Sequence, residues 1–341
     1  MLDSLQMFEA AYGLADQCAR AARDFDRVEG LPPSAGISSV LVLGMGGSGI
    51  AGDVAAAVAG PSCPVPILVC KDYECPDFVG PDTLVIAISF SGETEETVAA
   101  VHEAAGAGAR LVVITAGGHL QRIGREWGAP VIPLDATIPM PRAGIGAVSV
   151  PALLVLEQLG LFDGATEQVD AMVAQLQRRR DELSVDGNAA LELAARLGRT
   201  LPIVYGGGAL GETAAWRWKG QFNENPKVPS FANRVPELTH NEICGWAQHG
   251  DVTRQVLSML LLRHDFEHAQ VRRRFDLVEE ICDEIVAGVY SVEAKGDGRL
   301  AQLFDLVFVG DLVSLHMAQL AGVDPGPVPI LDEIKIRLRQ D

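Results

Sequence analysis

Two segments of this chain run from an apolar strand directly into a cluster of glycines. Residues 40–47 read Val-Leu-Val-Leu-Gly-Met-Gly-Gly, and residues 201–208 read Leu-Pro-Ile-Val-Tyr-Gly-Gly-Gly. A strand that turns through glycines into a helix is typical of parallel α/β sheets, in which the turn lies at the carboxyl end of the strand. The repetition predicts an α/β fold of two similar lobes and suggests a duplication.

Alternation of short apolar strands with helical segments extends this prediction to the whole chain. Strands buried on both faces predict a parallel sheet between layers of helices. A boundary near Gly164 divides the chain into domains 1–164 and 165–341. We expect first-lobe strands at 39–43, 65–70, 83–88 and 110–115 and second-lobe strands at 201–204, 252–261, 270–275 and 286–292. The expected helices lie at 4–29, 93–106, 147–159, 168–183 and 300–322.

The charge and the cysteines argue against several classes of protein. The 341 residues include 45 acidic and 27 basic side chains, for a formal net charge of -18, so nucleic acid is not an expected partner. The six cysteines lack paired CxxC spacing, and residues 1–4 have neither the basic nor the apolar stretch of a secretion signal. The longest apolar runs are shorter than the ~20 residues that span a bilayer. We therefore expect a cytoplasmic protein without membrane contact.

The first glycine cluster has the spacing of a nucleotide-binding or phosphate-binding turn. Residues 44–49 match GxGxxG between a strand and a helix, which is the dinucleotide fingerprint. An NAD(P)-dependent oxidoreductase is therefore one interpretation, although the acid expected ~20 residues later has only Asp72 as a candidate. The same backbone N–H groups could hold a sugar phosphate, and a tight turn without a ligand would have the same sequence.

A group of hydroxyl side chains follows the strand expected at 83–88. Ser89, Ser91 and Thr94 lie where a buried parallel strand meets the next helix, which is where open α/β sheets bind ligands. Three hydroxyls and the N–H groups of the first helical turn provide enough donors for a phosphate without a lysine. The alternative is a capping box, in which Ser91 or Thr94 only caps the helix.

Together the two turns resemble the sugar isomerase (SIS) domain. That domain combines Gly-x-Gly-Gly-Ser-Gly after one strand with Ser-x-Ser-Gly-x-Thr-x-Glu-Thr after another, and residues 44–49 and 89–97 have these patterns. Further segments resemble the bifunctional phosphoglucose/phosphomannose isomerases of archaea and bacteria, namely residues 140–146, 219–225, 237–242 and 323–335. This resemblance, over nearly the whole chain, implies two SIS subdomains, a phosphorylated hexose substrate, no metal or other cofactor, and a homodimer with shared active sites.

The resemblance also implies roles for individual residues. Metal-independent aldose–ketose isomerisation through an enediol needs a carboxylate base and donors for the enediolate. By similarity to the family, Glu224 is the base that moves a proton between C2 and C1, and Arg142 stabilises the enediolate. His240, implied to come from the other subunit, would open the sugar ring. The implied substrate-binding residues are Gly46, Gly47, Ser48, Ser89, Ser91, Thr94 and Lys335.

One departure from the family pattern concerns substrate choice. Members that accept the mannose epimer tend to carry a threonine before the tail lysine, whereas residues 327–331 read Pro-Val-Pro-Ile-Leu, without a hydroxyl. Activity on mannose 6-phosphate is therefore left open, as is a non-catalytic regulator that only binds the sugar phosphate. His264 and His268 have the i,i+4 spacing of metal ligands, but their charged neighbours favour a solvated helix face, and we predict no metal site.

Overall fold

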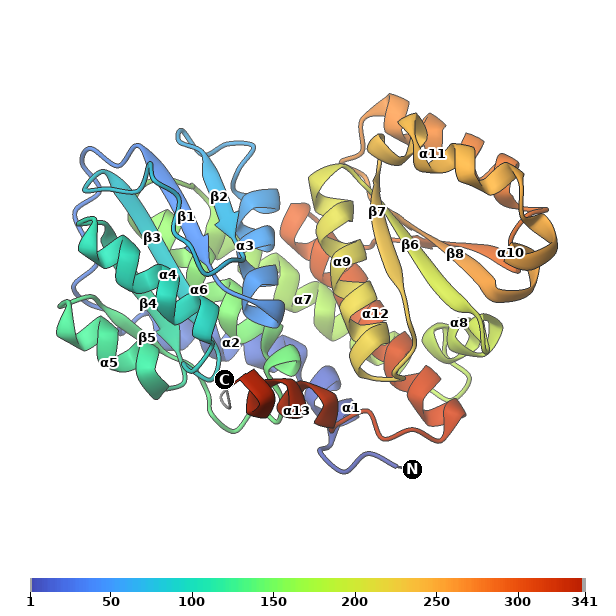
Figure 1. The fold of residues 1–341 in the computed structure, drawn as a ribbon, viewed down its shortest axis with the longest axis horizontal. Helices are drawn as coiled ribbons and strands as arrows, with labels where there is room; N and C mark the ends of the chain where they lie inside the picture. Colours follow the sequence, from blue (N-terminus) through green and yellow to red (C-terminus); the bar gives the residue numbers. More distant parts are fainter. Residues whose placement is uncertain (1, 339–341) are drawn as a thin grey trace.

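The computed structural model describes residues 2–338, which form two parallel β-sheets surrounded by helices (Figure 1). The first sheet has the strand order β2-β1-β3-β4-β5, and the second has the order β7-β6-β8-β9. All strand pairs within both sheets are parallel. The α/β class and the two lobes predicted from the glycine turns are thereby confirmed.

The first sheet supplies the strand ends at which the two polar turns lie. Its strands are β1 (Ser39–Leu43), β2 (Ile67–Cys70), β3 (Thr83–Ser89), β4 (Arg110–Thr115) and β5 (Val131–Pro133). The helices of this half are α1 (Met7–Tyr12), α2 (Leu14–Phe25), α3 (Gly46–Val58), α4 (Glu95–Gly106), α5 (Gly118–Glu126), the 3-10 turn η1 (Pro141–Gly144) and α6 (Ile145–Gln158).

The second sheet consists of β6 (Leu201–Gly207), β7 (Phe231–Val235), β8 (Leu257–Arg263) and β9 (Gly288–Glu293). Its helices are α7 (Ala165–Leu183), α8 (Ala189–Leu197), α9 (Gly208–Glu224), α10 (Gly250–Val256), α11 (Ala269–Cys282), α12 (Arg299–Ala321) and α13 (Pro329–Leu338). Two 3-10 turns, η2 (Glu237–His240) and η3 (Glu242–Ala247), lie between β7 and α10.

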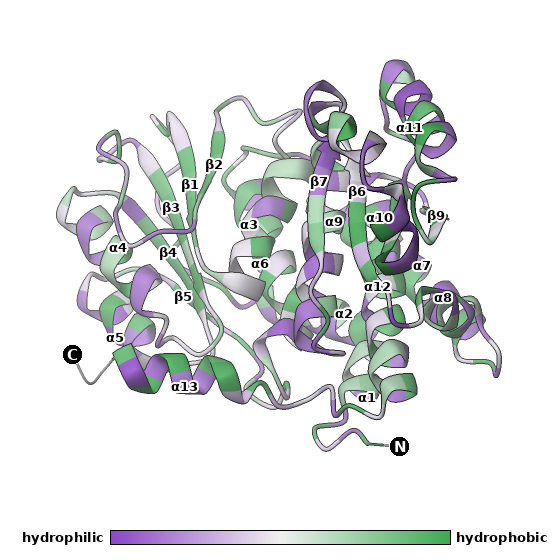
Figure 2. Cartoon of the chain, turned by 45° about the vertical axis from the view of Figure 1, so that its right-hand side comes forward, coloured by the Kyte–Doolittle hydropathy of each residue, from purple (hydrophilic) through white to green (hydrophobic). Residues whose placement is uncertain are grey.

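The inner faces of the two sheets share one helical core. Val40 and Ile86 of the first sheet belong to the same buried cluster as Val204 and Leu260 of the second, together with residues of α3, α6, α9 and α12. The alternate strand residues face outward, where α4 and α5 cover the first sheet and α11 covers the second. Figure 2 shows both hydrophilic and hydrophobic residues on α11, as expected for a helix between a sheet and solvent.

Helix α12 is the central element of this core. By length and composition alone, the helix could cross a membrane. Most of its apolar side chains are buried, because α7, α8 and α9 pack around it. These side chains therefore belong to the core of the fold.

The second lobe differs from the sequence prediction in two places. Residues 250–256 form α10 before the strand β8, so the strand expected at 252–261 begins only at Leu257. The strand expected at 270–275 is wrong, because this segment belongs to α11. The buried residues of α11 are Val271, Phe275, Val278 and Cys282, which have helical spacing that a six-residue window conceals.

The sequence prediction also missed the strands β5 and β7, and the predicted boundary near Gly164 is not decided by the architecture. Gly164 precedes α7 in a left-handed conformation, with φ 79°. Because α7 packs against both α2 and α12, it joins the two halves of the molecule. The division into residues 1–164 and 165–341 stays a prediction.

Candidate active site

The first glycine turn allows close packing between α3 and η1. Gly46 begins α3 with φ 52°, a conformation that suits glycine. A Cβ at Gly47 would lie 3.2 Å from the carbonyl oxygen of Pro141 and 3.5 Å from Cα of Arg142. Glycine at position 47 therefore lets the backbone that carries Arg142 lie directly beside the turn.

The hydroxyl turn lies at the end of the neighbouring strand, β3. Ser89 is fully buried, its Oγ accepts a hydrogen bond from the N–H of Gly92, and it lies 2.8 Å from Oγ1 of Thr94. Ser91 is exposed, and its Oγ accepts a hydrogen bond from the N–H of Glu93. Thr94 is the N-cap residue of α4, but its side chain makes no capping bond. The capping box considered from the sequence is therefore not formed by Thr94.

Ser48 connects the two turns. Its buried Oγ accepts a hydrogen bond from the N–H of Phe90 at 3.2 Å, and this bond joins the glycine turn to the hydroxyl turn. One further hydroxyl, Oγ1 of Thr97, is buried in the first turn of α4 and has no hydrogen-bond partner among the described residues. Thr97 lies within the motif quoted above, although its role was not predicted.

Arg142 lies in η1, its side chain is buried, and hydrogen bonds from two of its nitrogens fix it in place. Its Nε donates to Oδ1 of Asn225 at 2.9 Å, and its Nη2 donates to the carbonyl oxygens of Pro325 and Gly326. Its Nη1 lies 3.4 Å from Oε2 of Glu224. Burial lowers the pKa of Arg142, although the negative charge of Glu224 opposes this effect. Nη1 is thus the guanidinium nitrogen that faces the candidate base.

Glu224 is the last residue of α9, and its side chain is 34% exposed, so it is reachable from solvent.

Lys227 lies just after this helix and bonds backbone carbonyl oxygens at its C-terminal end. Its ammonium donates to the carbonyl oxygens of Glu224 and Asp324, both at 2.8 Å, and its backbone has φ 60°. Burial lowers the pKa of Lys227, and the positive charge of Arg142 lowers it further. Lys227 was not predicted from the sequence.

His240 and Lys335 are not joined to this group within the chain. His240 ends η2 and is exposed, and its side chain makes no hydrogen bond to Glu224 or Arg142. Lys335 lies on α13, which has no buried residue, and it forms no ion pair with any residue of the described range 2–338. The tail nevertheless passes beside Arg142 at Pro325 and Gly326 before it reaches α13.

The second glycine turn does not reproduce the first. A Cβ at Gly207 would lie 3.1 Å from Oε1 of Glu267, and the carbonyl oxygen of Gly207 lies 2.8 Å from Nε2 of His264. Glu267 is itself paired with Arg263. A carboxylate at this turn disfavours a phosphate, so the hydroxyl-lined turn of the first lobe has no counterpart here.

The histidine pair considered from the sequence is divided between two elements. His264 follows the strand β8, whereas His268 is the N-cap residue of α11 and accepts a hydrogen bond from the N–H of Gln270. The two side chains therefore do not share the face of one helix. The solvated face expected from the sequence is wrong for His264, which is buried. Among residues 2–338, no three His, Cys, Asp or Glu side chains form a group that could hold a metal ion.

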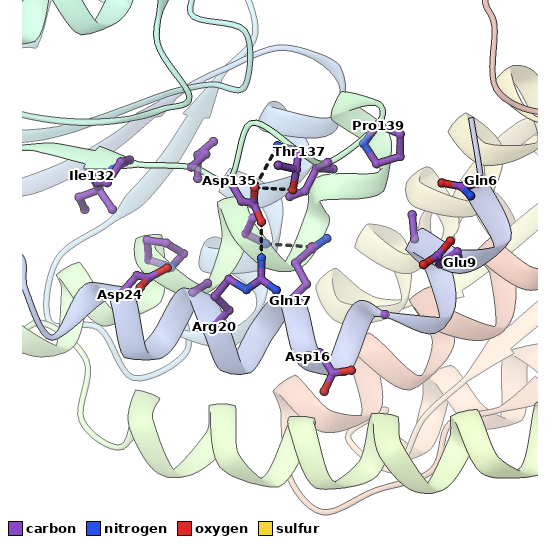
Figure 3. A pocket seen from close by; sticks show the side chains of 18 of the residues that line it. Gln6, Glu9, Asp16, Gln17, Arg20, Asp24, Ile132, Asp135, Thr137 and Pro139 are labelled. Carbon is purple, nitrogen blue, oxygen red and sulfur yellow. Dashed lines mark hydrogen bonds and ion pairs between the residues drawn. The ribbon is translucent and has the colours of Figure 1, made fainter. Parts of the chain in front are cut away.

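A separate cavity of about 420 Å³ lies between α1 and α2 and the segment from β5 to η1 (Figure 3). Its acidic side chains include Glu9, Asp16 and Asp24, and Arg20 reaches across it to Asp135. It contains none of the predicted site residues. Because acidic groups predominate and Arg20 is already paired, this cavity is unsuited to a phosphate.

Known proteins similar to this chain belong to the family that the two turns indicate. A family described as the C-terminal SIS domain of bacterial phospho-glucose isomerase matches residues 186–338, and the SIS domain matches residues 36–122. A bifunctional phosphoglucose/phosphomannose isomerase of Caldicellulosiruptor bescii is 35% identical, over 98% of this chain and 99% of that protein. The chain belongs to the bifunctional phosphoglucose/phosphomannose isomerase family.

Another protein with the name of this isomerase family, from Aquifex aeolicus, is 34% identical over 92% of this chain and 94% of its own length. Among solved structures, a putative phosphosugar isomerase from Clostridium difficile has a TM-score of 0.69 at 13% identity, covering 94% of this chain and 93% of that one. This likeness shows the shared fold. The two relatives and the family matches confirm the resemblance inferred from the sequence motifs.

Proposed function

We propose that this chain interconverts glucose 6-phosphate and fructose 6-phosphate through an enediol, without a metal or other cofactor. The observation that carries the proposal is the 3.4 Å approach of Nη1 of Arg142 to Oε2 of Glu224, directly beside the glycine turn. A carboxylate base and a fixed cation are what proton transfer between neighbouring carbons requires. The family membership supports the same reaction class.

The phosphate would bind at the first lobe. The hydroxyls of Ser48, Ser89, Ser91 and Thr94, with the backbone around Gly46 and Gly47, supply its donors, and the N-terminus of α4 favours its negative charge. The bond that Ser48 accepts from the N–H of Phe90 leaves its hydroxyl proton available to a ligand. Ser89 and Thr94 share one hydrogen bond, so one of these two hydroxyls keeps a proton for the phosphate. Lys335 stays a predicted contact from α13.

The chemical step would then take place between Glu224 and Arg142. Glu224 removes the proton from C2 of the open-chain aldose and delivers it to C1, while the hydroxyl proton of O2 moves to O1. Nη1 of Arg142 donates to the enediolate oxygens that carry the developing charge. The other guanidinium N–H groups are bound to Asn225, Pro325 and Gly326, which fixes the direction of Nη1.

Ring opening is assigned to His240 of a second copy of the chain. Its exposure, and the lack of any bond to Glu224 within the chain, support a role across the interface of a homodimer with shared sites. Two side chains of the second sheet hold this segment, because Tyr205 and Asn233 both donate hydrogen bonds to Glu242. A cytoplasmic location, without membrane or nucleic-acid partners, completes the proposal.

The coupled assay that converts fructose 6-phosphate into glucose 6-phosphate in the presence of EDTA tests this proposal. We expect turnover that EDTA does not change, and mannose 6-phosphate tested in parallel decides the second substrate. Loss of activity in EDTA and its recovery with zinc would contradict the metal-free reaction. Sugar-phosphate binding without turnover would instead establish the non-catalytic regulator, and NADH binding by fluorescence titration would favour the oxidoreductase.

A further inference from the structure

Behind Arg142, a closed ring of buried hydrogen bonds joins η1 to α9 and α12. Arg217 of α9 binds Asp311 of α12 through two nitrogens, at 3.1 and 2.8 Å. Nη2 of Arg217 also donates to the backbone carbonyl oxygen of Arg142 at 2.7 Å. The pair is therefore connected directly to the backbone of the candidate catalytic residue.

The ring closes through the side chain of the same arginine. Nε of Arg142 donates to Asn225, whose Nδ2 donates to Oγ of Ser314 at 2.8 Å. Ser314 in turn donates to the carbonyl oxygen of Asp311 at 2.7 Å. Two chains of hydrogen bonds therefore connect Asp311 with Arg142. One runs through Arg217 to the carbonyl oxygen of Arg142. The other runs through Ser314 and Asn225 to its guanidinium group.

All members of the ring are buried. Arg142 and Arg217 are 3% exposed, Asp311 is 5% exposed, and Asn225 and Ser314 are fully buried. Two buried guanidinium groups repel each other unless carboxylates compensate their charge, and within residues 2–338 Asp311 is the only carboxylate that binds Arg217. Gln221, one turn before Asn225 on α9, also donates to Asp311 at 2.8 Å. The carboxylate of Asp311 therefore holds Arg217 and Gln221, whereas the arm through Ser314 ends on the backbone carbonyl oxygen of Asp311.

We propose that Asp311, acting through Arg217, is a positioning residue that fixes the direction of Arg142 toward Glu224. The expected effect on turnover rests on the proposed function. The expected effect on the direction of Arg142 rests on the hydrogen-bond ring alone. The carboxylate of Asp311 bonds Arg217 and Gln221 and forms no hydrogen bond or ion pair with the side chain of Arg142 or Glu224. Small displacements of a reacting or stabilising group lower the rate steeply, by ~100-fold for about 1 Å.

A matched control lies on the same helix. Asp305 of α12 is also buried, and it binds Arg179 at 3.0 Å and Gln175 at 2.8 Å, both on α7. This second cluster has the same residue types as the Asp311 cluster, but Arg179 makes no bond to Arg142. Asp305→Asn therefore removes a comparable buried charge without disturbing the ring.

The experiment compares Asp311→Asn, Asp305→Asn and the double variant Arg217→Met/Asp311→Leu in the isomerase assay. We expect both single variants to lower the melting temperature, but only Asp311→Asn to lower kcat, by ~10–100-fold with KM within about threefold. The double variant removes both buried charges, so it should regain melting temperature while kcat stays low. Equal kcat losses in the two single variants, or recovery of kcat in the double variant, would overturn the inference.

Hydrogen exchange measured by mass spectrometry gives a readout that does not depend on the reaction. We expect faster exchange in the segment 140–146 in Asp311→Asn than in Asp305→Asn, because the backbone of η1 loses its anchor. Equal exchange in this segment would contradict the positioning role even if the wild-type protein isomerises sugars. A wild-type protein without isomerase activity, but with this difference in exchange, would contradict the proposed function alone.

Discussion

Nη1 of Arg142 and Oε2 of Glu224 lie 3.4 Å apart, although the two residues are 82 positions apart in the sequence. Arg142 is held by carbonyl and amide oxygens on its other nitrogens, so it approaches Glu224 in a fixed direction. A fixed guanidinium beside a solvent-accessible carboxylate can stabilise charge that forms only during the reaction. We therefore expect substitutions of either side chain to lower turnover.

Arg142→Lys should lower kcat by at least ~100-fold, even though the positive charge is kept. An ammonium cannot bind Asn225, Pro325 and Gly326 and also direct a donor at the substrate. Steady-state kinetics with fructose 6-phosphate measures the effect. Arg20→Lys, in an exposed ion pair with Asp135, is the matched control and should remain near wild type.

Glu224→Gln keeps the shape of the side chain but removes the base. Turnover should fall by at least ~100-fold, while KM stays within a few-fold. Glu212→Gln on the same helix makes the same chemical change in a surface ion pair with Arg234 and should have little effect. Near-normal turnover in Glu224→Gln would mean that another carboxylate is the base.

The hydroxyl turn should govern substrate binding. Ser89→Ala, Ser91→Ala and Thr94→Ala should each raise KM by ~10–100-fold, because a hydrogen bond to a charged group contributes about 1.5–3 kcal/mol. Ser62→Ala, which removes an exposed hydroxyl bonded only to the carbonyl oxygen of Ala59, is the control. Unchanged KM in all three variants would leave the segment with a purely structural role.

The two turns were predictable because each is encoded by a short local pattern. The glycines permit a conformation and close contacts that side chains would obstruct, and the hydroxyls follow directly from a buried strand. The proximity of Arg142 and Glu224 was available only through the family resemblance, because it depends on how η1 packs against the end of α9. Tertiary packing is not visible in local periodicity.

The residues that position Arg142 are harder to predict from the sequence. Asp311 is an acid inside the largely apolar helix α12, and a buried acid requires a partner. That rule indicates an ion pair but does not name Arg217. The error at α11 has a similar origin, because its buried positions become evident only over several helical turns.

Stability should depend on the protonation of His316 in α12. Burial lowers the pKa of this ring, and its Nε2 has no hydrogen-bond partner among residues 2–338. Below the unfolded pKa of ~6.5 the unfolded chain binds a proton that the folded chain does not, so stability falls as the pH falls toward the folded pKa. His316→Phe removes this effect and keeps an aromatic ring against Phe8. The melting temperature of the variant should exceed that of wild type by more at pH 5.5 than at pH 7.5, and an equal difference would contradict this assignment.

The shared active site can be tested by mixing two inactive variants. If His240 of one subunit serves Glu224 of the other, a mixed dimer of Glu224→Gln and His240→Ala has both defects in one site and an intact second site. Subunit exchange should therefore restore up to about a quarter of the wild-type activity, because about half of the dimers are mixed and each has one working site. If each chain built its own complete site, every subunit would keep a lesion and exchange could not repair it. Mixtures that stay inactive, although mass spectrometry shows exchange, would refute the contribution of His240 across the interface.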